Sequence, residues 1–249
     1  MPPRPPLIID KNDSTKSLET IETRPGVRQS FVHLQPIDPN ADTLIIFPGG
    51  SGRGQVFEKN ALIGTRGSFV ARSIDLWQRK YRIIVIDTPS DHAGGMTETF
   101  RRMTNHRLDI SMLMDAITKR WPTHFILLGT SLSTISAFNI GAAGDPRIKA
   151  VILTSTHVNY LEQTAIESIR VPVLLVSHKD DGCPLTKPIQ SQKFRDILAR
   201  NIKADYIEIS GGSQKDSPCE AYSHHGFNGV EAETIAAIQN WILEISKSK

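Results

Sequence analysis

The chain of 249 residues lacks long apolar runs, has only two cysteines and carries no strong excess of one charge. No apolar stretch approaches the about 18 residues that a membrane-spanning helix needs, so no membrane span is expected. The 29 basic and 26 acidic residues give a net charge of +3, with no block of five or more like charges. This balance argues against a nucleic-acid partner. The pair Arg101-Arg102 with nearby Arg107 is therefore interpreted as a solvated face.

The first residues of the chain do not have the pattern of a secretory signal peptide. Residues 1–6 read Met-Pro-Pro-Arg-Pro-Pro and lack the apolar core of a secretory signal peptide. The compartment stays open, because the protein is cytoplasmic if this is its native start and secreted or periplasmic if a signal peptide has been removed. The two cysteines and eight histidines lack the spacing of zinc ligands, so neither a metal nor another cofactor is expected.

Composition and pattern predict one α/β domain. Hydrophobic residues make up 39% of the chain and charged residues 22%, as in ordinary soluble globular proteins. Residues 1–16 are proline-rich and then polar, and we expect a flexible N-terminal arm there, with 17–249 as a single domain. A hairpin with a Pro25-Gly26 turn opens this domain, and strands then alternate with helices. The expected strands are 18–24, 27–34, 43–47, 81–86, 124–128, 149–153, 171–177 and 205–209.

Helical patterns separate and follow these strands. Segment 69–80 is helix-like, apolar residues recur at helical spacing over 110–121, and 230–246 is amphipathic with Ile235, Ile238 and Ile242 on one stripe. Strand and helix in turn predict a mostly parallel eight-stranded sheet with helices on both faces. In such a sheet functional sites form just beyond the carboxyl ends of the strands, so those positions are the ones to inspect.

The most informative segment is 124–135, where an apolar run ends in Gly129-Thr130-Ser131 and a helix-compatible stretch follows at once. A serine on such a sharp turn has its hydroxyl held clear of the backbone, and the following amides lie at a helix N-terminus. Gly-x-Ser also occurs at 49–51 and 211–213, but only at 131 does a strand precede and a helix follow. Ser131 is the candidate nucleophile, and a serine that merely caps a helix is the alternative.

Three further strand ends carry glycine-rich or polar residues. Residues 48–54 read Pro-Gly-Gly-Ser-Gly-Arg-Gly, a loop that lacks the Gly-Lys-Ser/Thr ending of a phosphate-binding loop. Residues 178–184 supply two adjacent carboxylates, Asp180 and Asp181, and residues 223–227 place His224 and His225 just before the last helix. With Ser131 these segments offer the hydroxyl, imidazole and carboxylate of a catalytic triad.

The order of these parts resembles the α/β-hydrolase family over residues 18–246. In that family a glycine-rich oxyanion loop, a Gly-x-Ser-x-Gly segment, an acid after a late strand and a His-Gly loop before the final helix follow one another. The resemblance implies an eight-stranded α/β-hydrolase fold with Ser131 as the nucleophile.

The resemblance also selects the other two members of the triad. Members of the family commonly place the acid four residues before a proline, which favours Asp180 through Pro184 and leaves Asp181 as the alternative. The family histidine is commonly followed by glycine and an aromatic or apolar residue, which favours His225 over His224.

An acyl-enzyme mechanism follows from the resemblance, in which Ser131 attacks an ester carbonyl and water later releases the acyl group. The oxyanion donors are then the amide of Leu132 and that of Gly50 or Ser51. The chain departs from the family pattern in having proline at position 48, where many relatives have histidine, and Ser133 in place of the second glycine. Neither departure removes a catalytic group.

The expected substrate is a small carboxylic ester with a short acyl chain. About seventeen residues separate strands 149–153 and 171–177, too few for the cap domain of many relatives, so an open site is expected. Segment 88–105 is either a wall of the substrate pocket or a plain surface loop, and His157 and His178 are candidates for substrate contact. A thioesterase, acyltransferase or peptidase shares the acyl-enzyme step, and a non-catalytic small-molecule receptor is a further alternative.

The two cysteines fall in the loops that meet at the triad in this family. Cys183 follows the candidate acids directly, and Cys219 lies six residues before His225. We expect a disulfide between them, with two unrelated free thiols as the alternative. A bridge of this kind favours export from the cytoplasm. The sequence makes no prediction of the oligomeric state.

Overall fold

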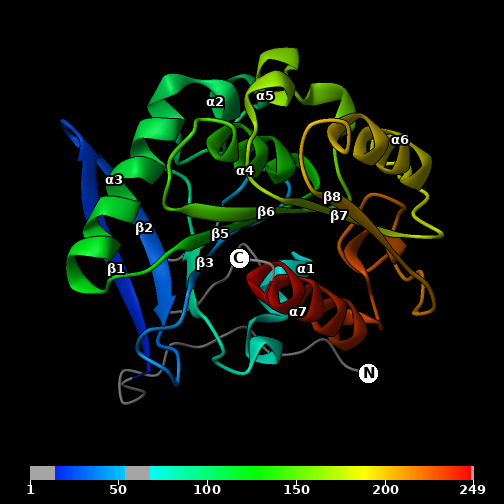
Figure 1. The fold of residues 1–249 in the computed structure, drawn as a ribbon, viewed down its shortest axis with the longest axis horizontal. Coiled ribbons are helices and arrows are strands. Elements are labelled where there is room, and N and C mark those ends of the chain that lie inside the picture. The colour runs from blue at the N-terminus through cyan, green and yellow to red at the C-terminus, as the bar shows by residue number, and fades with distance from the viewer. Residues whose placement is uncertain (1–14, 54–67, 248–249) are drawn as a thin grey trace.

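The computed structural model describes residues 15–53 and 68–247 of the chain, coloured in Figure 1. Within these residues eight strands form one sheet in the order β1-β2-β4-β3-β5-β6-β7-β8. The strands are β1 (Lys16–Arg24), β2 (Val27–Leu34), β3 (Thr43–Phe47), β4 (Arg82–Ile86), β5 (Phe125–Thr130), β6 (Ile148–Thr154), β7 (Val173–His178) and β8 (Ala204–Ile209). Strands β1 and β2 pair antiparallel, β2 joins β4 antiparallel, and all pairs from β4 to β8 are parallel. The predicted mostly parallel eight-stranded sheet is confirmed.

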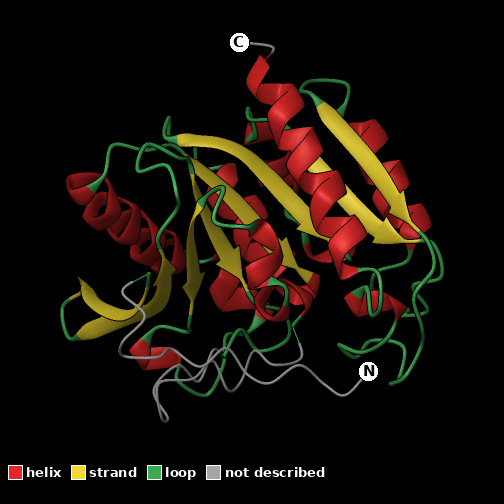
Figure 2. Cartoon of the chain, turned by 90° about the horizontal axis from the view of Figure 1, so that it is seen from below, coloured by secondary structure: helices red, strands yellow, loops and turns green. Residues whose placement is uncertain are grey.

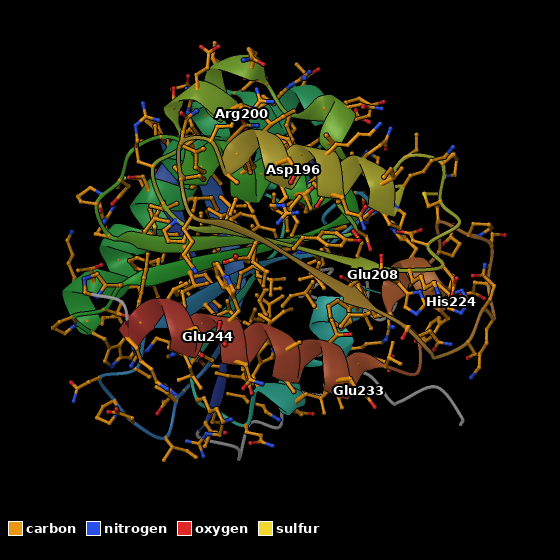
Figure 3. All side chains as sticks on the ribbon, turned by 45° about the vertical axis from the view of Figure 1, so that its right-hand side comes forward. Asp196, Arg200, Glu208, His224, Glu233 and Glu244 are labelled. Atoms are coloured by element: carbon orange, nitrogen blue, oxygen red, sulfur yellow. A yellow bond between two sulfur atoms is a disulfide. The ribbon has the colours of Figure 1, made fainter. Side chains whose placement is uncertain are left out.

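Helices cover both faces of this sheet, as Figures 2 and 3 show. On one face lie α1 (Phe69–Arg72), the short helix η1 (Ile74–Trp77) and α7 (Glu231–Lys247). On the other lie α3 (Thr104–Arg120), α4 (Thr134–Gly141), α5 (Gln163–Ser168) and α6 (Pro188–Leu198). In Figure 3 Asp196 and Arg200 mark the α6 side, and Glu233 and Glu244 mark α7 across the sheet.

Burial on both faces explains the composition of the central strands. Every residue of β3, β4, β5 and β7 is buried, and their runs of Ile, Leu and Val suit strands packed between two layers of helices. The edge strand β1 is mostly half-buried and carries alternating polar residues. No helix within the described ranges is both long and apolar enough to cross a membrane.

Some expected segments differ from what the structure contains. Segment 69–80 is not one helix, because α1 and η1 are separated at Ser73, and Gln78 and Arg79 take positive φ values of 52° and 55° before β4. Segment 88–105 contains the short helices η2 (Ser90–His92) and α2 (Glu98–Arg102) and the start of α3, so it is not a plain loop. Of the expected arm over 1–16, residues 1–14 lie outside the described residues, and β1 begins at Lys16.

The register of the central strands brings their following loops together. Strand β3 pairs with β5 so that Phe47 lies opposite Gly129, and β5 pairs with β6 so that Thr130 lies opposite Thr154. The loop after β3 and the turn after β5 therefore leave the sheet side by side. Between β6 and β7 the described chain forms only η4 (Val158–Tyr160) and α5, so no cap domain is inserted there.

Candidate active site

Ser131 lies on a sharp turn between β5 and α4. It takes a left-handed backbone conformation with φ of 52° and begins the short helix η3 (Ser131–Ser133). The strand and the helix approach so closely that a Cβ on Gly129 would lie 2.5 Å from the carbonyl oxygen of Ser133. Glycine at 129 is therefore required by packing, and the turn presents the Ser131 hydroxyl at the carboxyl edge of the sheet.

His225 lies within hydrogen-bond distance of that hydroxyl. Its Nε2 is 3.0 Å from Ser131 Oγ. It belongs to η5 (His224–Gly226), where the Ser223 hydroxyl accepts from the His225 N–H at 3.1 Å and the Ser155 hydroxyl donates to the His225 carbonyl at 2.7 Å. A Cβ on Gly226 would overlap the carbonyl oxygen of a neighbouring turn, which explains why glycine follows the histidine. The structure thus brings the predicted serine and histidine together.

The carboxylate beside His225 belongs to Asp181, and the choice of Asp180 was wrong. His225 Nδ1 lies 3.1 Å from Asp181 Oδ2, and the Asp181 side chain is fully buried. Asp180 is exposed, and only its backbone N–H takes part, donating to Nδ1 of His178 at 3.1 Å. After β7 the chain reverses so that the Asp181 N–H donates to the His178 carbonyl at 3.0 Å. This turn directs the side chain of residue 180 to solvent and that of residue 181 inward. The spacing of four residues from Asp180 to Pro184 carries no information on that turn.

The Asp181 carboxylate has further donors. The backbone N–H of Cys183 donates to its Oδ1 at 2.9 Å, and the hydroxyl of Thr186 donates to its Oδ2 at 3.0 Å. The same hydroxyl oxygen lies 3.0 Å from His225 Nδ1 and is buried. Thr186 was not among the predicted residues, and the signal in the sequence was a short polar side chain five residues after Asp181.

A disulfide joins Cys183 and Cys219, whose Cα atoms lie 4.6 Å apart. The expected bridge is confirmed. It connects the loop of Asp181 with the segment that leads to His225, two parts of the chain that are 36 residues apart at the bridged positions.

The glycine-rich loop after β3 forms a tight turn beside Ser131. The Gly52 N–H donates to the Gly49 carbonyl at 3.2 Å, and the Ser51 carbonyl accepts from the Met96 N–H at 2.9 Å. Within the described residues the N–H groups of Gly50 and Ser51 have no hydrogen-bond acceptor. As far as the described residues go, both N–H groups can donate to a bound group.

A pocket of about 340 Å³ opens at these residues. Its lining includes Gly49, Gly50, Ser51, Phe69, Ser131 and His225, with Arg53 and Glu220 adding charge. Segment 88–105 does not contribute to this lining; it packs behind the glycine-rich loop instead, as the Met96 contact shows. The expectation that this segment forms a wall of the pocket is not met here.

The other histidines are placed away from Ser131 or are deeply buried. His178 stacks on His224 with ring centroids 4.5 Å apart, and its Nε2 lies 2.8 Å from the Gly211 carbonyl. Figure 3 shows His224 near the edge of the molecule, beyond the end of β8. Burial, followed by the charge of His225, lowers the pKa of His157 to about 4, so His157 is neutral at pH 7. Across the described ranges no group of three or more His, Cys, Asp or Glu is arranged to hold a metal.

Arg101 differs most from its expected environment. A solvated face was predicted for Arg101, but its side chain is fully buried. Burial lowers the pKa of Arg101 to about 10, against a smaller opposite effect of Glu98, so the guanidinium remains charged at neutral pH. A charged doublet in sequence gives no sign that one of its two members points into the protein.

Comparison with solved structures shows which fold the chain shares. No protein-family profile and no curated protein matches the sequence. Among solved structures, Est1E from Butyrivibrio proteoclasticus superimposes with a TM-score of 0.66 and 15% identity, over 92% of this chain and 99% of that one. XC6422 from Xanthomonas campestris is described as an α/β serine hydrolase without lid. It superimposes with a TM-score of 0.62 and 13% identity, over 92% of this chain and 95% of that one.

A thermostable esterase is similar in the same way, with a TM-score of 0.63 and 17% identity over 92% of this chain. This chain spans 63% of the length of that esterase. Together with the eight-stranded sheet, these likenesses define the class: the chain has the α/β-hydrolase fold, and its described residues form no cap domain between β6 and β7.

Proposed function

We propose that the protein is a serine hydrolase that cleaves carboxylic esters. The observation that carries this proposal is the unbroken series of contacts from Ser131 Oγ to His225 Nε2 at 3.0 Å and from His225 Nδ1 to Asp181 Oδ2 at 3.1 Å. A hydroxyl, an imidazole and a carboxylate in this geometry are the parts of a nucleophilic triad. The esterases among the structural neighbours support the same reaction class.

In the proposed reaction Ser131 Oγ attacks the ester carbonyl while His225 Nε2 takes the hydroxyl proton. Asp181 accepts the Nδ1–H of His225, holds the required tautomer and stabilises the imidazolium. His225 then gives the proton to the leaving alcohol. Water attacks the acyl-enzyme by the same route, which releases the carboxylic acid and restores Ser131.

The oxyanion donors in this proposal are the amide of Leu132 and that of Gly50 or Ser51. Leu132 follows the nucleophile directly at the beginning of η3, and the two loop amides line the pocket without an acceptor among the described residues. Preorganised donors of this kind stabilise the charge that develops on the carbonyl oxygen, and each typically contributes a factor of about 10²–10³ in rate.

We expect a preference for short acyl chains of roughly two to six carbons, because a pocket of about 340 Å³ offers little room to a long chain. A panel of p-nitrophenyl esters from acetate to palmitate measures this preference as kcat/KM. The expected result is a maximum at or below hexanoate, and a higher value for palmitate than for butyrate would contradict it.

The control for the panel is Ser131→Ala, which removes the nucleophile and leaves the buried core intact. We expect it to lower kcat by several orders of magnitude with little change in the thermal midpoint of unfolding. Retention of most of the activity by the folded variant would rule out the proposed mechanism. A thioester and an amide in the same panel separate the ester hydrolase from a thioesterase or a peptidase.

A further inference from the structure

Arg101 is a buried cation placed directly behind the glycine-rich loop. Its Nη2 donates to the Gly50 carbonyl at 2.8 Å, and its Nη1 donates to the hydroxyls of Ser133 at 2.6 Å and Ser136 at 3.3 Å. Among the described residues no carboxylate forms an ion pair with it. Burying a guanidinium that makes no ion pair with the described residues is costly, so its position calls for an explanation.

Ser133 supplies the other half of this arrangement. It occupies the position of the second glycine in the Gly-x-Ser-x-Gly pattern, and its hydroxyl donates to the Pro48 carbonyl while it accepts from Arg101. The side chain is fully buried. Ser133 therefore connects the turn that carries Ser131 and Leu132 with both the start of the glycine-rich loop and Arg101.

The contact to the Gly50 carbonyl sets the direction of an amide. In a planar trans peptide the C=O and the following N–H point in opposite directions, so a Gly50 carbonyl turned toward Arg101 turns the Ser51 N–H away from it. The Gly49 carbonyl is held in the same way by the Gly52 N–H at 3.2 Å, which orients the Gly50 N–H. Each candidate donor N–H is thus oriented by a hydrogen bond to the carbonyl of the same peptide group, which belongs to the preceding residue.

We propose that Arg101 and Ser133 are positioning residues that align the two halves of the oxyanion hole, the loop amides of Gly50 and Ser51 and the Leu132 amide of the nucleophile turn. This inference rests on the proposed function. The Arg101 fork holds the glycine-rich loop, Ser133 holds the nucleophile turn against it, and the buried positive charge favours the negative oxyanion in front of the loop.

The test compares Arg101→Met, Arg101→Lys and Ser133→Ala with the wild-type protein in the hydrolysis of p-nitrophenyl butyrate. Misaligned oxyanion donors weaken binding of the transition state more than binding of the substrate. We expect Arg101→Met and Ser133→Ala to lower kcat about 10- to 100-fold with KM within about threefold, and Arg101→Lys to lose less because it keeps the charge. Arg102→Met, at the next position of α2 with a partly exposed side chain paired to Glu162, is the matched control and should keep wild-type kinetics.

A second readout separates alignment from general destabilisation. An alkyl boronic acid adds to a serine hydroxyl as a tetrahedral boronate whose oxygen takes the oxyanion position. We expect its inhibition constant to rise in each variant by the same factor as kcat falls, with circular dichroism confirming the folded state. If Arg101→Met does not fold, Ser133→Ala, which keeps Arg101, decides the matter.

Folded variants with kcat within twofold of wild type, or with losses confined to KM, overturn the positioning role while leaving the proposed function intact. A wild-type protein that neither hydrolyses the ester nor binds the boronate overturns both. A parallel loss of kcat and boronate affinity in Arg101→Met and Ser133→Ala, absent from Arg102→Met, is the result that the inference requires.

Discussion

At the scale of single residues, the hydroxyl of Thr186 contacts both the Asp181 carboxylate and the His225 imidazole. It donates to Asp181 Oδ2 at 3.0 Å and lies 3.0 Å from His225 Nδ1, while the Cys183 N–H holds the other carboxylate oxygen at 2.9 Å. These two donors hold the buried carboxylate in one orientation. The acid is therefore held in place before any substrate binds.

The acid assignment leads to a direct comparison of two neighbouring residues. We expect Asp181→Asn to lower kcat by about 10³–10⁴-fold, because an amide at this position holds the wrong tautomer of His225. Asp180→Asn, at an exposed position, is the matched control and should stay within about threefold of wild type. Steady-state kinetics of both variants on a short-chain ester decide the assignment, and a larger loss in Asp180→Asn would contradict the structure.

Single residues also show where prediction from sequence ends. Ser131 and His225 were predicted because each stands in a local pattern, a strand followed by a helix or a histidine followed by glycine. Asp181 was missed by one position, because a turn of two residues after β7 decides which carboxylate faces inward. Arg101 was taken as exposed, because its partners Gly50 and Ser133 lie 51 and 32 residues away in sequence.

At the scale of elements, the site is formed by loops that follow different strands and lie far apart in the sequence. The disulfide between Cys183 and Cys219 ties the acid loop to the segment before His225, and Cys219 also lines the pocket. The succession of the eight strands along the chain and their boundaries to within two residues followed from apolar runs and turn signals. The break of segment 69–80 at Ser73 and the helices within 88–105 did not, because tertiary packing overrides weak local preferences in short elements.

Removal of this bridge tests its contribution to stability. Closing a loop of 36 residues is worth about 4 kcal/mol in the chain-entropy model, so the double variant Cys183→Ser/Cys219→Ser should lose about 2–4 kcal/mol in the free energy of unfolding. Urea unfolding of the double variant and of wild type measures the difference. Wild type treated with a reductant under the same conditions should shift in the same direction. A double variant within about 0.5 kcal/mol of wild type would contradict a stabilising role.

At the scale of the whole molecule, buried neutral histidines make stability depend on pH. Burial, followed by the charge of Arg101, lowers the pKa of His106 to about 3, against a reference value of 6.5. Between these values the unfolded chain binds a proton that the folded protein does not. Stability contributed by neutral His106 is therefore present above about pH 6.5 and lost as the pH falls toward 3.

We expect His106→Gln to reduce the loss of stability between pH 7 and pH 5 by about 2 kcal/mol relative to wild type, whatever it does to stability at pH 7. His124→Gln is the matched control, because the His124 side chain is 68% exposed. Urea unfolding at pH 7 and pH 5 gives the change in the free energy of unfolding for each variant and for wild type. An unchanged pH dependence in His106→Gln would show that His106 is not the group responsible.

Covalent labelling tests whether Ser131 is a nucleophile activated by His225 and Asp181. A fluorophosphonate forms an oxygen–phosphorus bond with an activated serine and releases fluoride, so intact-mass spectrometry followed by peptide mapping identifies the modified residue. We expect one adduct per chain, located on Ser131, with labelling abolished in Ser131→Ala and slowed at least a hundredfold in His225→Ala. An unlabelled folded protein, or an adduct located on another residue, would contradict it.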